Sequence, residues 1–227
     1  MSKTIYDGNT TQYNIRTVLF DVGLDPSHFD GRVLDIGCGK EARVVVYLNE
    51  NGIEADGVDP ELTIEKPFLI KRDASKGIPK PDNHYDFAYS SMSLFKDGGA
   101  SNRYFIIKLT DEKRFDVIYT GRKNCMLRTV NEVVRVLKPG HDFAVWPYPA
   151  FFAEDVRPKL ERKGIVLRKD EVTEDPDLSG KILEICSNKK SMYKALGYFG
   201  LTGFDDDIMH ELTTDEFMHR MVLTKPG

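Results

Sequence analysis

The sequence predicts an α/β protein with one mostly parallel β-sheet and helices on both of its faces. Short apolar runs alternate with segments of helical period, and clusters of turn residues separate them, which is the pattern of such a sheet. The chain has 227 residues, of which 41% are hydrophobic, enough to fill the core of one domain. We therefore expect a single domain over residues 1–227.

The first half of the chain predicts two helices and four strands. The apolar residues of 11–22 recur at helical spacing and Gly23 follows them, so we expect a helical cover within residues 1–30. Gly52 lies in the favoured position just after the second helix. In chain order the predicted elements are a helix over 11–22, a strand over 32–36, a helix over 41–51, and strands over 53–58, 68–72 and 85–90.

The second half predicts two more helices and three more strands. Pro139-Gly140 is expected to end the first of these helices. The turn over 176–180 is short, so the last two strands are expected to be antiparallel. Residues 190–227 are expected to form a C-terminal extension, as a lid, a dimer arm or a packed helix. The predicted elements are a helix over 126–137, a strand over 143–146, a helix over 154–163, and strands over 165–172 and 181–186.

An insertion over residues 96–124 interrupts this alternation after the fourth strand. Two apolar runs, 104–109 and 115–119, flank a polar connection, which predicts an inserted β-hairpin. Residues 96–128 hold eight Lys and Arg against four Asp and Glu, a balance of +4. The insertion is therefore basic.

The whole chain, by contrast, is mildly acidic. It holds 32 Lys and Arg against 36 Asp and Glu, a net charge of −4, which argues against general binding to nucleic acid. The three cysteines are far apart and form no CxxC, so we expect neither a disulfide framework nor a metal site. The N-terminus lacks the apolar region of a secretion signal, and no apolar run approaches the roughly 20 residues that span a bilayer. We expect a soluble cytoplasmic protein with no membrane partner.

The sharpest motif lies where the first predicted strand meets the second helix, over residues 33–42. Gly37 and Gly39 permit positive φ and let a ligand approach the backbone, while the helix start offers unpaired N–H groups to an anionic group. With Ala42, this spacing also fits a dinucleotide-binding fingerprint. Asp35 disfavours that alternative, because a carboxylate beside the glycines repels a pyrophosphate but accepts hydrogen bonds from an ammonium group.

Carboxylates also follow the next two strands. Asp59 ends the second strand about 20 residues downstream, where a carboxylate can accept both hydroxyls of a ribose. Asp73 ends the third strand, where its carboxylate can take an adenine amino group and the N–H of Ala74 a ring nitrogen. Together with Asp35, these residues suit an amino acid joined to a nucleoside.

With these residues the chain resembles the class I S-adenosylmethionine-dependent methyltransferases that carry an LDIGCG motif. The resemblance rests on four separated stretches in order, Leu34 to Gly39, Gly57 to Asp59, Arg72 to Ala74 and Arg135 to Gly140. It implies a Rossmann-like fold with a seven-stranded, mostly parallel sheet and an antiparallel last strand. The implied cofactor is S-adenosyl-L-methionine. The implied cofactor-binding residues are Asp35, Gly37, Cys38 and Gly39 at the methionine end, Asp59 and Pro60 at the ribose, Asp73 and Ala74 at the adenine, and Ser90 near the sulfonium.

Two positions depart from the family pattern. Glu41 stands where many relatives have a third glycine, and His141 stands where a second glycine usually follows Pro-Gly. Glu41 is expected either to favour the first turn of its helix through the helix dipole or to approach the donor's amino group. If it obstructs the donor instead, the protein is a non-catalytic binding or regulatory relative.

The acceptor of the methyl group is not encoded in a motif. Ser90-Ser91-Met92-Ser93 replaces the Asn-Pro-Pro-Tyr type of segment with which related enzymes hold the amines of DNA bases. We expect a small-molecule acceptor, with an RNA or protein acceptor reached through the basic insertion as the alternative. A dinucleotide-dependent oxidoreductase is the more distant alternative, and no catalytic base is assigned.

Overall fold

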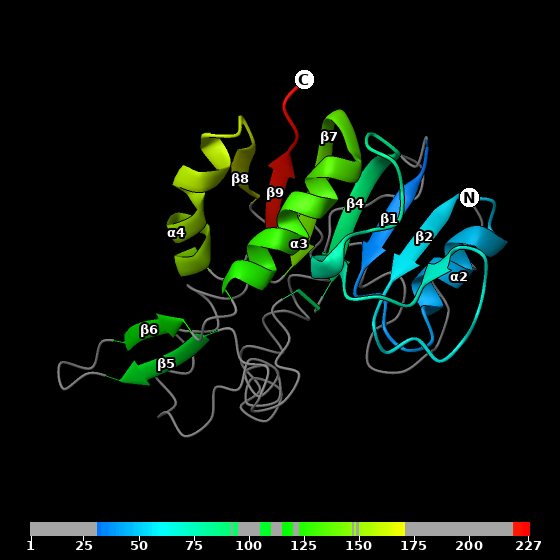
Figure 1. Cartoon of the computed structure of the whole chain (residues 1–227), viewed down its shortest axis with the longest axis horizontal. Helices are drawn as coiled ribbons and strands as arrows, with labels where there is room; N and C mark the ends of the chain where they lie inside the picture. The colour runs from blue at the N-terminus through cyan, green and yellow to red at the C-terminus, as the bar shows by residue number, and fades with distance from the viewer. Residues whose placement is uncertain are drawn as a thin grey trace, which may run out of the picture.

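The computed structural model contains a seven-stranded sheet in the order β3-β2-β1-β4-β7-β9-β8 (Figure 1). It describes residues 31–91, 93–94, 105–109, 115–119, 123–146, 148, 150–170 and 220–227. The strands of this sheet are β1 (Val33–Ile36), β2 (Ala55–Val58), β3 (Leu69–Ile70), β4 (Tyr85–Ser91), β7 (Leu137–Trp146), β8 (Val166–Asp170) and β9 (Arg220–Thr224). All neighbouring pairs are parallel except the two that β9 makes, which are antiparallel. The predicted sheet with its antiparallel last strand is confirmed.

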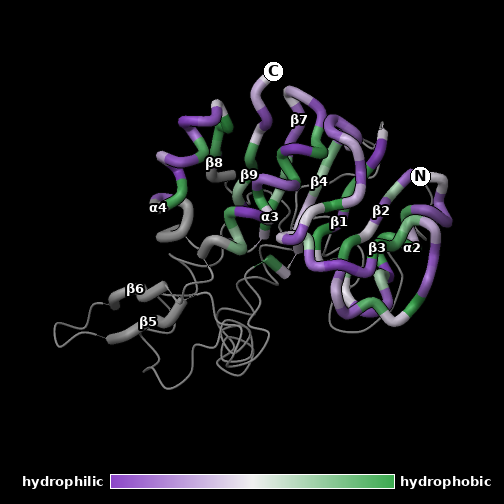
Figure 2. The backbone as a smooth tube through the Cα atoms, viewed as in Figure 1, coloured by the Kyte–Doolittle hydropathy of each residue, from purple (hydrophilic) through white to green (hydrophobic). Residues whose placement is uncertain are grey.

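Helices cover both faces of the sheet, as the sequence predicts. On one face α2 (Arg43–Glu50) buries Val45 and Leu48 against Val33 of β1 and Tyr89 of β4. The opposite face packs against α3 (Lys123–Val136) and α4 (Ala150–Glu161), and η3 (Ala74–Lys76) is a short 3₁₀ turn on the same side. Figure 2 shows hydrophobic residues in β1, whose adjacent residues Val33 and Leu34 are buried in the clusters on opposite faces, as expected of a sheet covered on both faces.

The inserted hairpin is also confirmed. Strands β5 (Phe105–Leu109) and β6 (Phe115–Tyr119) follow β4 and pair antiparallel in a sheet of their own. The predicted helix over 11–22 lies outside the described residues.

The structure gives β8 an antiparallel partner that the sequence did not predict. We expected residues 165–172 to pair with 181–186, but β8 pairs with β9, near the C-terminus, and 181–186 lie outside the described residues. Strand β9 also pairs with β7, and its apolar residues Met221, Val222 and Leu223 are buried. Strand β9 joins the sheet by burying these apolar side chains between two strands that are distant from it in sequence.

The start of β7 also differs from the prediction. Helix α3 ends at Val136, and Pro139-Gly140 lies inside β7 rather than between the helix and the strand. The pairing of β4 with β7 jumps from Tyr85↔Leu137 to Phe87↔Asp142, so the residues between Leu137 and Asp142 bulge out of the ladder. Such a bulge accommodates a proline, which has no N–H to donate.

Candidate functional site

The carboxyl ends of β1, β2 and β4 bring most of the predicted site residues to one edge of the sheet. Strand β1 pairs with β2 on one side and with β4 on the other. The strand order reverses between β1 and β4, which is where open α/β sheets bind ligands. Gly37, Cys38 and Gly39 follow β1, Asp59 and Pro60 follow β2, and Ser90 lies near the end of β4.

The glycines form a tight loop after β1, which we call the glycine loop (residues 37–42). Gly37 and Gly39 both have φ of +77°, a conformation that favours glycine. A Cβ added at Gly37 would lie 2.2 Å from Oγ of Ser93, whereas one added at Gly39 would meet no heavy atom of the described residues within 4 Å. At position 37 both the backbone conformation and the nearby side chain of Ser93 therefore favour glycine. At position 39 only the backbone conformation does.

Asp59 ties the end of β2 to this loop. Its Oδ2 accepts a 2.9 Å hydrogen bond from the N–H of Gly39, and its Oδ1 accepts one of 2.7 Å from the N–H of Glu61. A carboxylate has about four acceptor positions, so each oxygen can accept one more hydrogen bond. Asp59 thus shapes the glycine loop and still has capacity for a pair of hydroxyls.

Asp35 is a buried acid beneath the loop. Its Oδ2 accepts a 2.9 Å hydrogen bond from the hydroxyl of Tyr89, which lies directly opposite it in the β1–β4 pairing. Burial, together with a smaller effect of the charge of Asp59, raises the pKa of Asp35 to about 7, although the hydrogen bond from Tyr89 acts to lower it. Near neutral pH this carboxyl group is close to half ionised, and a cationic ligand would favour its charged form.

Cys38 is a thiol packed into the same corner. A Cβ added at Gly57 of β2 would lie 2.8 Å from its Sγ. Burial, then the charges of Asp35 and Asp59, raise the pKa of Cys38 well above its usual range. The thiol stays protonated at neutral pH and is not an activated nucleophile.

Asp73 and Ala74 form the turn that leads from β3 into η3. Oδ1 of Asp73 accepts a 2.9 Å hydrogen bond from the N–H of Ser75 and so caps the turn. Among the described residues, Oδ2 of Asp73 has no hydrogen-bond partner. Ala74 is buried in the same cluster as Ile36 and Val58, the last residues of β1 and β2. Because β3 runs parallel to β2 and β2 to β1, this turn follows the same edge of the sheet as the glycine loop.

The serines at the end of β4 join that strand to β1. Ser90 is fully buried, and its Oγ lies 2.7 Å from Oγ of Ser93, which in turn donates a 2.6 Å hydrogen bond to the carbonyl of Ile36. The hydroxyl of Ser90 is thus engaged within the protein. The sequence analysis did not single out Ser93 or Tyr89, because their roles depend on how β1 and β4 are paired.

Glu41 does not have the helix-dipole role that was expected. Helix α2 begins at Arg43, one residue after the Ala42 cap, and its first turn contains no acid. The carboxylate of Glu41 instead forms an ion pair with Arg43 at the surface.

His141 and His84 lie away from this edge. They flank the amino end of β4, where Nε2 of His141 is 3.7 Å from Asp86 and Nδ1 of His84 is 3.5 Å from Arg32. Neither histidine is therefore placed to act as a base at the carboxyl edge.

The sheet order, with β9 antiparallel between β7 and β8 and helices on both faces, defines a Rossmann-like α/β fold. No protein-family model and no curated protein matches the sequence. Within the described ranges no helix is long and apolar enough to cross a membrane.

Solved structures give remote likenesses. One is the [4+2]-cyclase SpnF, with 17% identity, a TM-score of 0.47, and coverage of 93% of this chain and 80% of that chain. Another is a complex of the Haloferax volcanii Trm112 methyltransferase activator with a methyltransferase. Its identity is 13% and its TM-score 0.48, and the match covers 93% of this chain and 92% of that chain. A third is a Haemonchus contortus phosphoethanolamine N-methyltransferase in complex with S-adenosyl-L-methionine. Its identity is 14% and its TM-score 0.45, and the match covers 94% of this chain and 52% of that chain. Likenesses this remote decide neither the reaction nor its substrates.

Proposed function

We propose that this chain is an S-adenosylmethionine-dependent methyltransferase that binds its donor at the carboxyl edge of β1 and β2. The observation that carries the proposal is Asp35, a buried carboxyl group with a pKa of about 7 placed just before two glycines with positive φ. Such a group disfavours a pyrophosphate and suits an ammonium group, whose charge offsets the cost of ionising the buried acid. S-adenosylmethionine carries that ammonium group next to a nucleoside.

The remaining residues fit the other parts of the donor. Asp59 keeps one acceptor position on each oxygen, which suits the two ribose hydroxyls. Asp73 has Oδ2 available for an adenine amino group, and the neighbouring N–H of Ala74 suits a ring nitrogen. Gly39 leaves room for a ligand along the loop, since an added Cβ there would lie more than 4 Å from every atom that the structure describes outside its immediate neighbours.

Catalysis in this proposal comes mainly from positioning. The bound donor would supply an electrophilic methyl group: a lone pair of the acceptor atom forms the new bond to the methyl carbon, the electrons of the broken C–S bond stay on sulfur, and an acceptor that arrives protonated also releases its proton. Holding two reactants at attack distance accounts for a large part of such a rate enhancement, and a base is needed only for an acceptor that is protonated.

A small-molecule acceptor is the first choice, because the chain as a whole is acidic, with a net charge of −4. An RNA or protein acceptor is the second choice, and the basic insertion with its balance of +4 over residues 96–128 favours it. A regulatory subunit that binds the donor without turnover is the alternative outside the enzyme class.

Calorimetry with S-adenosylhomocysteine, NAD and NADP tests the donor site. Binding of S-adenosylhomocysteine alone supports the proposal, whereas no binding of it, or tight binding of either dinucleotide, overturns it. Tritiated methyl transfer from S-adenosylmethionine into fractionated cell extract then separates an enzyme from a regulatory subunit. The labelled fraction, treated with ribonuclease or protease, identifies the class of acceptor.

A further inference from the structure

Residues 77–84 connect η3 to β4 without any helix or strand, and their conformation has to be held from outside. Pro79 and Pro81 remove two backbone N–H groups from this segment, which limits the hydrogen bonds it can make itself. The N–H groups of Asn83 and His84 instead donate to the carbonyls of Arg135 and Val136, at 3.2 and 2.6 Å. The last turn of α3 is therefore the support of this segment.

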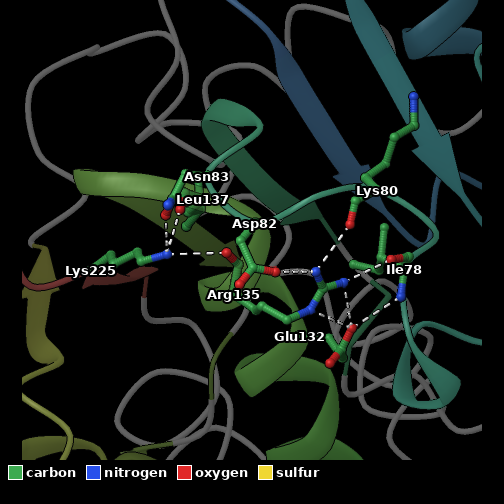
Figure 3. Close-up of polar contacts among 8 residues, drawn as sticks. All are labelled: Ile78, Lys80, Asp82, Asn83, Glu132, Arg135, Leu137 and Lys225. Atoms are coloured by element: carbon green, nitrogen blue, oxygen red, sulfur yellow. Dashed lines mark hydrogen bonds and ion pairs between the residues drawn. The ribbon is translucent and has the colours of Figure 1, made fainter.

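Arg135 makes the largest number of these contacts (Figure 3). Its Nη1 donates to the carbonyl of Lys80 at 3.0 Å and to Oδ1 of Asp82 at 2.7 Å. Its Nη2 donates to the carbonyl of Ile78 at 2.8 Å. One planar guanidinium thus fixes three successive points of the segment, which the single ammonium of a lysine cannot do with the same geometry.

Glu132, one turn earlier on α3, completes the arrangement. Its Oε2 accepts hydrogen bonds from Nη2 and Nε of Arg135, at 3.0 and 3.2 Å, and from the N–H of Ile78 at 3.1 Å. Burial opposes its ionisation, but the hydrogen bonds from Arg135 and Ile78 outweigh burial and lower the pKa of Glu132. Glu132 and Arg135, which we call the α3 clamp, therefore hold both the N–H and the carbonyl of Ile78.

A single residue separates this clamped point from the turn at the site. Gly77, with φ of +97°, ends η3, and its N–H donates to the carbonyl of Ala74 at 3.1 Å. Ile78 and Ala74 are both buried in the core cluster of the α3 face. Because Gly77 is a flexible residue type, the orientation of η3 depends on fixed points on both of its sides. The α3 clamp is one of them.

We infer that Arg135 and Glu132 are positioning residues that fix the turn of Asp73 and Ala74 for recognition of the adenine base, an inference that rests on the proposed function. Asp73 caps η3 at one end and Gly77 joins η3 to the clamp at the other. The clamp touches no part of the ligand. It sets the direction in which the carboxylate of Asp73 and the N–H of Ala74 face, and so sets the preference for adenine over another base.

S-inosylhomocysteine is the probe that separates this role from a merely structural one. Compared with S-adenosylhomocysteine it has a carbonyl in place of the amino group and an N–H in place of a ring acceptor. A fixed Asp73–Ala74 pair should therefore prefer the adenine compound by about tenfold or more, since both hydrogen bonds would be mismatched. A variant that only loses stability would bind both ligands more weakly by the same factor and leave the ratio of the two dissociation constants unchanged.

The experiment measures both dissociation constants by calorimetry for the wild-type protein, Arg135→Lys, Glu132→Gln and Lys138→Met. Lys138 is the matched control. Its Nζ donates a 2.5 Å hydrogen bond to Oδ1 of Asp86 near the start of β4, and among the described residues it has no hydrogen bond or ion pair with residues 77–82. The expected result is a ratio that falls to about threefold or less in the two clamp variants and stays at the wild-type value in Lys138→Met. Glu132→Gln keeps the shape of the side chain and serves as the milder variant if Arg135→Lys does not fold.

Each remaining outcome is decisive. A wild-type protein that prefers the adenine compound, with clamp variants that keep the same ratio, overturns the positioning role and leaves the proposed function standing. A wild-type protein that binds both compounds equally overturns the reading of adenine by Asp73 and Ala74. A wild-type protein that binds neither compound overturns the proposed function itself.

Discussion

The hydroxyl of Tyr89 donates a 2.9 Å hydrogen bond to Oδ2 of Asp35, and both side chains are buried. The two residues come from neighbouring strands and lie opposite each other in the pairing of β1 with β4. This bond offsets part of the cost of burying the acid, but the pKa of Asp35 still rises to about 7. An acid in this state couples donor binding to pH.

Donor affinity should therefore rise with pH up to about pH 7 and then level off. An ammonium group pairs with the ionised form of Asp35. Below the pKa of Asp35, about 7, each unit by which the pH falls should weaken binding of the donor up to tenfold. Calorimetry of S-adenosylhomocysteine between pH 5 and 8 measures the midpoint. Tyr89→Phe removes a hydrogen bond that favours ionisation, so the midpoint should move upward. A flat profile in the wild-type protein would show that Asp35 does not pair with the ligand.

Asp35→Asn should stabilise the ligand-free protein at high pH while abolishing tight donor binding. The pKa of Asp35 in the folded protein lies above its unfolded value of 3.8, so ionisation of Asp35 destabilises the fold. This loss of folding free energy is absent below about pH 4 and complete above about pH 7. Its size is on the order of 2–4 kcal/mol. Asparagine keeps an acceptor for Tyr89 and carries no charge. Urea unfolding should therefore show a gain for the variant at pH 8 and none at pH 3.5, and a loss at pH 8 would contradict this prediction.

Gly37→Ala and Gly39→Ala form a matched pair, because both residues have φ of +77°. Each substitution should cost about 1–2 kcal/mol of folding free energy from backbone strain. Only at Gly37 would the new methyl group also collide with Ser93, whose hydroxyl bonds to the carbonyl of Ile36. Gly37→Ala should therefore lower thermal stability more than Gly39→Ala does.

Ligand binding should rank the same two variants differently. At Gly39 an added Cβ meets no atom of the described residues within 4 Å, so a methyl group there would project into the space proposed for the donor. Gly39→Ala should weaken S-adenosylhomocysteine at least tenfold for only a small loss of melting temperature. If Gly39→Ala binds the ligand as tightly as the wild-type protein, the glycine loop does not line the site.

The sequence predicts the parts of the fold and site that depend on local pattern. Gly37 and Gly39 are visible because they follow the apolar run of β1, and Asp35, Asp59 and Asp73 because they lie within or shortly after the predicted strands, whose carboxyl ends a parallel sheet brings to one edge. The hairpin of β5 and β6 is also predicted from local pattern, because two apolar runs flank a short polar connection.

What the sequence misses depends on pairing between distant segments. Strand β9 lies between β7 and β8, but nothing in the spacing of residues 220–224 shows which strands they join. Tyr89 and Ser93 become part of the candidate site only through the alignment of β4 with β1. The contacts of Arg135 with Ile78 and Lys80 join residues more than 50 positions apart. Periodicity and turn rules describe local structure and hold no information on such contacts.

Lys225 follows β9 and caps the end of α3, so Lys225→Met should destabilise the protein (Figure 3). Its Nζ donates to the carbonyls of Leu137 and Arg135, at 2.7 and 3.1 Å, and to Oδ1 of Asn83 at 2.8 Å. Methionine keeps the apolar stem but removes all three donors, so the carbonyl of Leu137 loses its side-chain donor and the carbonyl of Arg135 keeps only the N–H of Asn83. The expected loss is about 1–3 kcal/mol in urea unfolding.

Lys163→Met is the control for this loss, because Nζ of Lys163 makes one exposed 2.6 Å hydrogen bond to Asn131. Exposed contacts of this kind contribute little, so its unfolding free energy should stay within about 0.5 kcal/mol of the wild-type value. Because Lys225 and Arg135 both act on the segment before β4, the double variant Lys225→Met with Arg135→Lys should lose less than the two single losses added together. Strict additivity would show that the C-terminal strand and the α3 clamp hold that segment independently.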